Sequence, residues 1–460
     1  MFSISLRNYI SCTALAVLSV DLLATSGDIT MTWSSPMFPK LYSNDTTVNP
    51  LGTPITADED SWIGSLLNIG AIVGPLPFGF ISERYGRKIA LLAIAVPHII
   101  SYVTMAFANN VYIFYFGRLL GGVAVGGGYT LLPMYIAEVA EESERGIYSV
   151  TLGIFWAFGN FFPYAVGPFL SVMWFNLALA CFPLAFLLAF SIFGRETPYY
   201  LMSAGKTLEA KEVLMYLRSK SEKDVEVELE LIKTTLDKEE HGRLSDVLKN
   251  KGLRKALFIS VALLAFQQLS GVNAISFYMQ PIFEASGTSI SSDWSALSAG
   301  ICIFIFSLLI PVVVDRFDRT VLITFASLLM SLCLSAIGIF FYIKDKTDLS
   351  SKSIFWLPLA SLVVNTFAFQ VGFAAIPWTI SSELFPNDVK NVAASATSIS
   401  CYLTSFLMTK FFDDMTKSLG VYGTFWFFAF SCILCAAFTH FYVPETRGKT
   451  FMEIQQILQK

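Results

Sequence analysis

The sequence is poor in charged residues, which make up only 14% of its 460 positions. Soluble domains average about 25% charged residues, so a chain that is 54% hydrophobic cannot cover its whole surface for water. With a net charge of −4, the chain also lacks the basic surface that nucleic-acid binding requires. The composition therefore predicts a protein whose partner is the lipid bilayer and that does not bind nucleic acid.

Groups that carry enzyme chemistry are equally scarce. Three histidines are scattered along the chain, at 98, 241 and 440, and offer little for a catalytic triad or a metal site. The seven cysteines fall in apolar stretches and lack the paired spacing of a zinc site. We therefore expect no enzyme activity, no metal and no cofactor, and we interpret the cysteines as small buried hydrophobic residues.

Long runs without a charged residue dominate what is present. A helix needs about 20 apolar residues to cross a bilayer. The run 146–194 is long enough for two helices, with a turn expected near Ser171 to Asn176. The first run is broken only by Asp21, and an acid inside the apolar stretch argues against a cleaved signal peptide. Twelve spans are predicted, in the runs 8–27, 61–82, 89–117, 119–137, 146–194 (two), 256–283, 294–314, 320–343, 353–382, 391–409 and 418–444.

The distribution of lysine and arginine predicts the orientation. If the N-terminus lies inside, the cytoplasmic segments hold 24 of these residues and the outer segments hold 5. Positive charge concentrates on the cytoplasmic side, so both termini are expected there, in a multi-pass protein of the plasma membrane. The outer loop 31–60 then contains Asn44-Asp45-Thr46, which makes Asn44 the expected glycosylation site.

One polar segment, 195–255, interrupts the spans. It contains 13 basic and 12 acidic residues, and its apolar residues recur near helical spacing, so we expect short amphipathic helices. The segment divides the spans six and six. The predicted organisation is an all-α membrane protein with an N-terminal six-helix bundle (1–194), a cytoplasmic helical linker (195–255), a C-terminal six-helix bundle (256–443) and a cytoplasmic tail (444–460).

The two halves repeat a pattern of charges. Glu83-Arg84-Tyr85-Gly86-Arg87-Lys88 is matched by Asp315-Arg316-Phe317-Asp318-Arg319, and Arg195-Glu196-Thr197-Pro198 by Pro444-Glu445-Thr446-Arg447. In both halves an acid is followed by a base seven residues later. The repeats imply a duplicated unit, an architecture typical of transporters. We expect a cytoplasmic gate that pairs charges across the halves, although anchoring at lipid headgroups is an alternative. The gate residues are Glu83, Arg84, Arg87, Glu138, Arg145, Asp315, Arg316, Glu383 and Lys390.

Five motifs in order carry a family resemblance. They are Gly79-x-x-x-Glu83-Arg84-x-Gly86-Arg87-Lys88, Gly117-Arg118, Pro133-x-Tyr135-x-x-Glu138 with Arg145-Gly146, Gln267-Gln268-Leu269-Ser270-Gly271-Val272-Asn273, and Pro444-Glu445-Thr446-Arg447-Gly448. With them the chain resembles the sugar porter family of the major facilitator superfamily. Trp33-Ser34-Ser35-Pro36 is similar to its insect facilitated trehalose transporter branch. The resemblance implies two six-helix bundles that carry a mono- or disaccharide, such as glucose or trehalose, by alternating access.

The seventh span holds the polar residues that suit a sugar. Amides both donate and accept hydrogen bonds, as sugar hydroxyls do, and an aromatic ring can cover a sugar's apolar face. The resemblance implies sugar contacts at the positions matching Gln267, Gln268, Asn273 and Trp378. Hydrogen bonds between helices are an alternative role for the polar residues. Departures from the family pattern put glucose itself in doubt: Gly153 replaces a glutamine, and Ala374-Ala375 and Cys401-Tyr402 replace Gly-Pro and Asn-Trp.

Two acids lie in the first span, Asp21 and Asp28, about two helical turns apart. A charged acid in the bilayer is costly, so each must face the bundle interior or bind a proton. Both are candidates for proton coupling, and a hydrogen-bonded structural acid is the alternative for Asp21. We expect facilitated diffusion, with a proton-coupled symporter and a non-transporting sugar receptor as the alternatives. The glycines from Gly121 to Gly128 are interpreted as a close-packing face and not as a phosphate-binding loop.

Overall fold

The structure is a computed structural model that describes residues 11–237, 244–277, 279, 282, 292–314, 316–346, 356–449 and 451–459. Over these ranges the chain is helical and contains no β-strand, which confirms the all-α fold class. The helices of the first half are α2 (Cys12–Thr32), α3 (Ser34–Leu41), α4 (Ala57–Val73), α5 (Pro75–Tyr85), α6 (Arg87–Ala106), α7 (Val111–Val139), α8 (Arg145–Val166), η1 (Gly167–Phe169) and α9 (Val172–Phe193).

The polar segment forms the short helices expected of it, and the second half follows. These elements are α10 (Pro198–Ser203), α11 (Thr207–Arg218), α12 (Glu222–Asp237), α13 (Leu244–Lys249), α14 (Lys251–Leu269), α15 (Val272–Phe277), α17 (Ser292–Val314), α18 (Arg319–Lys346), α19 (Leu357–Ala368), the π-helical turn η3 (Phe369–Phe373), α20 (Ile376–Glu383), α21 (Asn387–Lys410), α22 (Phe412–Tyr442) and α23 (Phe451–Gln459).

Eleven helical segments within the described ranges are long and apolar enough to cross a membrane, and each falls on a predicted span. The remaining span, predicted at 294–314, lies on α17. The apolar segment of this helix, Leu297–Leu308, is shorter than those of the other eleven. The turn inside the run 146–194 comes earlier than expected. Ser171 caps α9 by accepting a hydrogen bond from the Trp174 N–H, so the helix already begins at Val172.

The described helices form two compact units. One contains Met1–Met31, Ile69–Asn160 and Leu170–Glu239, and the other contains Thr32–Asn68, Phe161–Phe169 and Glu240–Lys460. The second unit therefore combines short segments of spans one, two and five with the C-terminal half. These units describe compactness only, and the domain boundaries expected from the sequence stay a prediction.

In the first unit, α7 packs closely against its neighbours through glycine. A Cβ added to Gly126 would lie 2.2 Å from the Ala71 carbonyl oxygen, and one added to Gly74 would lie 2.1 Å from the Val123 carbonyl oxygen. Only glycine permits helix axes this close in a bilayer. The contacts support a close-packing face on span four.

The linker helices α10 to α12 belong to the same unit. Arg218, at the end of α11, connects them to α7. Its guanidinium pairs with Glu228 of α12 at 2.7 Å and donates to the Val139 carbonyl oxygen at 2.6 Å. Only 2% of the Arg218 side chain is exposed, so these bonds are shielded from water. Helices α10 to α12 thus pack as a layer of short helices within the first unit.

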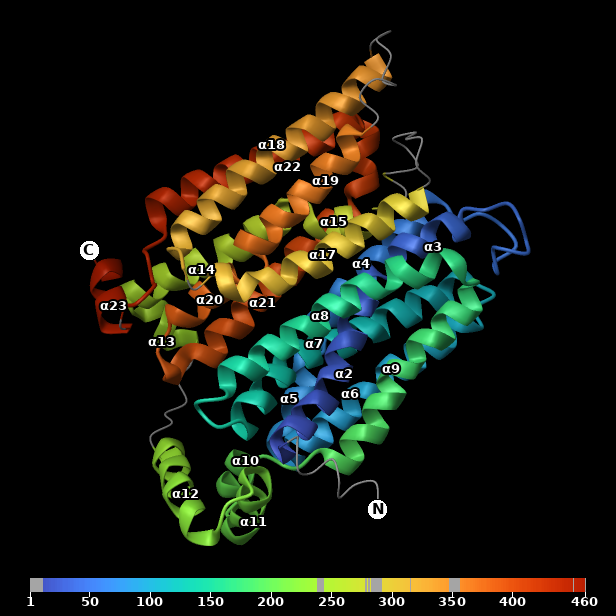
Figure 1. Cartoon of the computed structure of the whole chain (residues 1–460). Coiled ribbons are helices and arrows are strands. Elements are labelled where there is room, and N and C mark those ends of the chain that lie inside the picture. Colours follow the sequence, from blue (N-terminus) through green and yellow to red (C-terminus); the bar gives the residue numbers. More distant parts are fainter. Residues whose placement is uncertain are drawn as a thin grey trace. The chain divides into compact units, whose positions relative to one another are not determined.

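In the second unit, α18 and α22 lie side by side along much of their length (Figure 1). Phe341 and Phe425 stack between them with ring centroids 5.9 Å apart. The C-terminal α23 packs on α14, with Ile454 and Leu458 buried, and the Gln455 amide donates to the Leu384 carbonyl oxygen at 3.1 Å. This bond holds the residue next to Glu383, at the end of α20.

Candidate functional site

Span seven is broken between α14 and α15, and the break assembles an amide cluster. Gly271 connects the two helices with a φ of 79°, a conformation that favours glycine, and an added Cβ would lie 2.5 Å from the Phe428 ring. Gln267 and Gln268 end α14, while Asn273 lies in the first turn of α15. The break therefore brings three of the four sequence-predicted sugar contacts together.

Side chains from span eleven complete this cluster. Asn273 Nδ2 donates to Gln268 Oε1 at 2.8 Å and to Ser405 Oγ at 2.7 Å. Gln268 Nε2 in turn lies 3.2 Å from both Gln267 Oε1 and Cys401 Sγ. Gln267 and Gln268 are only 4% and 6% exposed, so these amides satisfy each other out of contact with bulk solvent.

Cys401 and Ser405 were missed as site residues by the sequence reasoning. They stand four positions apart on α21 and therefore share one helix face. Two small polar side chains four residues apart in an apolar span could have indicated these site residues from the sequence. Trp378 lies on α20 and is 37% exposed, and its role as an aromatic sugar contact stays a prediction.

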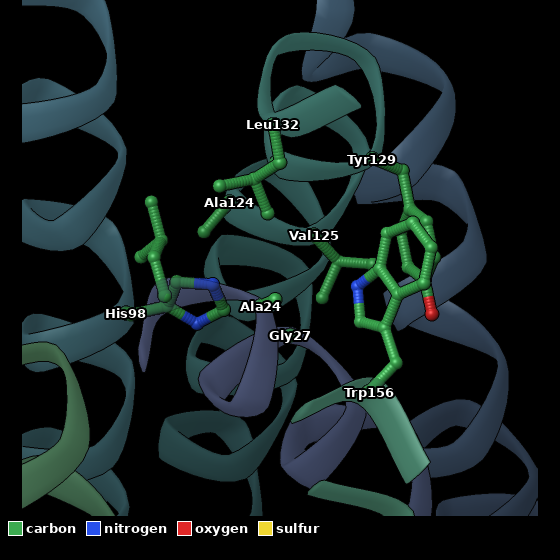
Figure 2. Close-up of a pocket in the computed structure, with 10 residues that line it drawn as sticks. Ala24, Gly27, His98, Ala124, Val125, Tyr129, Leu132 and Trp156 are labelled. Carbon is green, nitrogen blue, oxygen red and sulfur yellow. The ribbon is translucent and has the colours of Figure 1, made fainter. Parts of the chain in front are cut away.

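The first unit contains a narrow pocket among α2, α6, α7 and α8. Figure 2 shows Trp156 and Tyr129 together on one side and His98 on the other, with Ala24 and Gly27 between them. The Trp156 and Tyr129 rings stack with centroids 5.2 Å apart. The pocket of the first unit is therefore lined by aromatic and apolar side chains and not by amides.

Asp28 is held beside this pocket by two donors. The Tyr129 hydroxyl donates to Asp28 Oδ1, and Asn160 Nδ2 donates to Asp28 Oδ2 at 2.8 Å. Trp156 and Asn160 are four residues apart on α8, a helix-face signal that the sequence reasoning did not use. The structure therefore makes Asp28 a buried, hydrogen-bonded acid, 3% exposed.

Asp21 differs from Asp28 in its surroundings. It is fully buried, and among the described residues the Thr151 side chain is beside its carboxylate in place of the two donors that hold Asp28. A buried carboxylate is costly when charged. Both roles of Asp21, proton coupling and a hydrogen-bonded structural acid, stay predictions.

On the predicted cytoplasmic side, the same ion pair occurs once in each half. Arg87 Nε lies 3.1 Å from Glu138 Oε2, and Arg319 Nη2 lies 2.9 Å from Glu383 Oε1. In both pairs the guanidinium makes more than one hydrogen bond to the carboxylate. Each pair joins residues of one half, so the duplication seen in the sequence has a structural counterpart. Pairing across the halves stays a prediction.

A second acid in each half caps a helix. Glu196 accepts from the backbone N–H groups of Arg87 and Lys88 at the start of α6, and Glu445 accepts from those of Arg319 and Thr320 at the start of α18. Carboxylates are favourable at helix N-termini. Burial raises the pKa of Glu196 despite its hydrogen bonds. Burial also acts to raise the pKa of Glu445, but hydrogen bonds from Thr320 and the backbone outweigh it and lower that pKa.

The other predicted gate residues that the structure describes do not form ion pairs of this kind. Glu83, Arg84 and Arg316 are exposed, and Arg145 Nη2 lies 3.5 Å from the Tyr199 hydroxyl. Lys390 is half-buried on α21, without an ion pair to any described residue. Asp315 lies outside the described residues. The predicted glycosylation site, Asn44, is exposed in the loop between α3 and α4.

The model of one family, described as "Sugar (and other) transporter", matches residues 25–458. The chain belongs to the sugar (and other) transporter family. The facilitated trehalose transporter Tret1 of Aedes aegypti is 34% identical over 452 residues, which are 96% of this chain and 54% of that protein. Tret1 of Apis mellifera ligustica is 32% identical over 96% of this chain and 87% of its own. The chain thus spans about half the length of the mosquito relative.

Solved structures show the fold of this sugar (and other) transporter family member. The xylose transporter XylE from E. coli in its inward-open conformation matches with a TM-score of 0.76 at 24% identity, over 96% of this chain and 99% of that one. XylE described as a proton:xylose symporter bound to 6-bromo-6-deoxy-D-glucose matches with a TM-score of 0.74. The predicted major facilitator fold is therefore confirmed. The named relatives are transporters and not enzymes.

Proposed function

We propose that this chain is a carrier that moves a mono- or disaccharide, such as glucose or trehalose, across the membrane by facilitated diffusion. The observation that carries the proposal is the amide cluster of Gln267, Gln268 and Asn273 with Ser405. The named function of the insect relatives, facilitated trehalose transport, supports the same substrate class.

The chemistry of the cluster suits a ligand rich in hydroxyl groups. Gln267 and Gln268 are buried and Asn273 is half-buried, and the three amides satisfy one another's hydrogen bonds in place of water. A sugar hydroxyl both donates and accepts, and can replace these bonds one for one. An ion or an apolar ligand would leave amide groups unpaired. The cluster therefore favours sugars over both.

Contacts at the ends of the spans predicted to face outside support alternating access. Lys410 Nζ lies 2.7 Å from Asp58 Oδ1 and 4.3 Å from the centre of the Trp62 ring. The Tyr164 hydroxyl donates to the Ser276 carbonyl oxygen at 3.1 Å. These bonds join segments of spans two and five to the C-terminal half. A carrier needs such contacts to form and break once per cycle.

The cytoplasmic lock is the corresponding proposal for the inner side. Glu138, Arg145, Glu383 and Lys390 would pair across the halves in the inward-closed state. Neutralising Arg145 and Glu383 together should raise the labelling of a cysteine placed on the cytoplasmic side. Unchanged labelling would contradict the lock.

The transport test is counterflow into proteoliposomes with purified protein and a panel of glucose, fructose, trehalose and inositol. We expect exchange of at least one mono- or disaccharide. Sugar binding without flux would favour a receptor on the same scaffold, and binding of none of the four would contradict the proposal.

A residue-level test uses Gln268→Ala. Loss of its hydrogen bonds should weaken sugar binding by about 1–3 kcal/mol. Ser307→Ala is the matched control, because the Ser307 hydroxyl donates to the Phe304 carbonyl of its own helix at 2.7 Å. If binding is unchanged in Gln268→Ala while thermal stability falls, Gln268 is a structural residue.

We place the carrier in the plasma membrane with both termini cytoplasmic. Asn44 is exposed, so its side chain is accessible for glycosylation. If the outer loop is glycosylated there, Asn44→Gln should abolish a glycosidase-sensitive mass shift. A shift that persists in the variant would put the glycan elsewhere.

Proton-coupled symport is the second candidate, favoured by the burial of Asp28 beside the pocket of the first unit. Tyr129 and Asn160 both donate to this acid, and a change in its protonation would alter those bonds. Facilitated diffusion remains our proposal, since the relatives with the higher identity carry the word "facilitated" in their names.

A further inference from the structure

Span ten changes its hydrogen-bond pattern in the middle. After α19, the π-helical turn η3 carries the chain to Phe373, where the Ala374 N–H donates to the Phe369 carbonyl oxygen at 2.9 Å, five residues back. An α-helix resumes only at Ile376. Single π-turns inside helices are rare and concentrate at functional sites.

The sequence explains why the Phe373 carbonyl oxygen needs a hydrogen-bond donor from outside its own helix. In an α-helix its carbonyl oxygen would accept from the N–H of the residue four positions later. That residue is Pro377, which has no N–H. Phe373 is fully buried, so water cannot supply the missing donor. A buried carbonyl without a donor is unfavourable, and such groups almost always find a partner.

Gln267 of α14 is that partner. Its Nε2 donates to the Phe373 carbonyl oxygen, while its Oε1 accepts from Gln268 Nε2 at 3.2 Å. Gln268 continues to Asn273, which donates to Ser405. An unbroken chain of hydrogen bonds therefore runs from the break in span ten, through span seven, to span eleven.

The other side of the turn is fixed by close packing. A Cβ added to Gly372 would lie 2.2 Å from Ala326 Cβ and 2.9 Å from the Leu322 carbonyl oxygen, so η3 is pressed against α18. With this side held, a bend in span ten is confined to the residues between Phe373 and Ile376. The bond from Gln267 lies at the edge of that short segment.

We propose that Gln267 is a positioning residue that replaces the missing N–H of Pro377 and so couples the amide cluster to the bending point of span ten. The proposal rests on the proposed sugar site at Gln268 and Asn273. When a sugar hydroxyl binds Gln268, the hydrogen bond that Gln268 Nε2 donates to Gln267 Oε1 is lost or weakened. The altered amide then holds Phe373 more or less firmly, and span ten bends accordingly. Gln267 thus acts on transport through the backbone of span ten.

The test is amide hydrogen exchange of the segment 374–383 in purified full-length protein without sugar. Gln267→Met keeps the length of the side chain and removes the donor, and should speed exchange about fivefold to tenfold, the effect of losing one hydrogen bond. Gln267→Asn keeps the amide but is one methylene too short, and should behave alike. Ser307→Ala is the control, because the Ser307 hydroxyl donates to the Phe304 carbonyl oxygen of its own helix, and it should leave exchange within about twofold of the wild type.

Rescue comes from Pro377→Ala, which restores an N–H at the required position. In that background Gln267→Met should change exchange by less than about twofold, because Phe373 again has a helical donor. In counterflow, Gln267→Met should change the maximal rate more than the half-saturating sugar concentration, and Gln268→Met should do the reverse.

The proposal is overturned if Gln267→Met and Gln267→Asn leave exchange of this segment unchanged and weaken sugar binding as Gln268→Met does. It is also overturned if Pro377→Ala folds and gives no rescue. A wild-type protein that binds no sugar would contradict the proposed function, while the exchange measurement would still decide the role of Gln267.

Discussion

At the scale of single residues, the two compact units offer different chemistry to a ligand. The second unit contributes the amides Gln267, Gln268 and Asn273, whereas the pocket of the first unit is lined mainly by apolar and aromatic side chains. Gly153 on α8 lies three residues before Trp156, where the family resemblance leads one to expect a glutamine. The amide supply is thus concentrated in the second unit.

Restoring that glutamine is a direct prediction. A Cβ at Gly153 would have no atom within 4 Å, so Gly153→Gln should fold without strain and gain up to about 1 kcal/mol of helix propensity. If the new amide reaches a bound glucose, affinity should rise by about 0.5–1.5 kcal/mol, one net hydrogen bond. Equilibrium binding and thermal unfolding check both parts.

Gly126→Ala is the control for this substitution. The alanine Cβ at position 126 would lie 2.2 Å from the Ala71 carbonyl oxygen. We therefore expect Gly126→Ala to lower thermal stability, although it adds a smaller side chain than Gly153→Gln does. If Gly153→Gln proves as destabilising as Gly126→Ala, the space beside α8 is not open to a side chain.

At the scale of elements, the duplicated capping acids show how one motif acquires different properties in two places. Glu196 caps α6 and Glu445 caps α18 by the same backbone hydrogen bonds, yet the pKa of Glu196 is raised and that of Glu445 is lowered. The Thr320 hydroxyl adds a 2.7 Å hydrogen bond to Glu445. Where burial prevails, the pKa rises, and where the hydrogen bonds prevail, it falls.

These opposite shifts predict opposite pH dependences. A lowered folded-state pKa means that Glu445 contributes stability above its ordinary value of 4.5, and that this is lost as pH falls through the folded pKa. A raised pKa means that Glu196 contributes below 4.5 and loses its contribution as pH rises through the folded pKa. Thermal unfolding between about pH 3 and pH 7 measures both.

We expect Glu445→Gln to cost more stability at neutral pH than at acidic pH, and Glu196→Gln to show the reverse trend. The same trend in both variants would mean that burial and hydrogen bonding are balanced alike in the two caps.

The contact between α4 and α21 is the second prediction at this scale. Asp58 is 78% exposed, so its ion pair with Lys410 is worth only about 0–1 kcal/mol, and the Trp62 ring adds about 0.5–1 kcal/mol. Lys410→Met should therefore raise reagent labelling of a cysteine at Ser61 about twofold to tenfold. Lys417→Met, which breaks an exposed pair with Asp413 within α22, is the control and should leave labelling unchanged.

At the scale of the whole molecule, the question is what drives net movement of the sugar. Facilitated diffusion predicts no accumulation when proteoliposomes experience a pH gradient without a sugar gradient. Accumulation in the wild type that Asp28→Asn abolishes would establish proton coupling through the acid held by Tyr129 and Asn160. Asp21→Asn separates the two acids, since Asp21 is buried away from the Tyr129 and Asn160 donors that hold Asp28.

The spans, the family resemblance and the amide motif of span seven could all be predicted from the amino-acid sequence. A charged side chain is so costly in a bilayer that the absence of charge marks each span. The repeated acids and arginines likewise predict a duplicated unit. Such features depend on neighbours along the chain or on the solvent around it.

The partners of these residues could not be predicted from the sequence, because they depend on how the helices pack. Glu138 pairs with Arg87 of its own half, Cys401 and Ser405 join the amide cluster from a distant span, and Gln267 reaches the Phe373 carbonyl left free by Pro377. Each of these contacts joins residues at least fifty positions apart. Their pairing follows from how helices pack, because a buried polar group bonds whichever partner the packed helices place beside it.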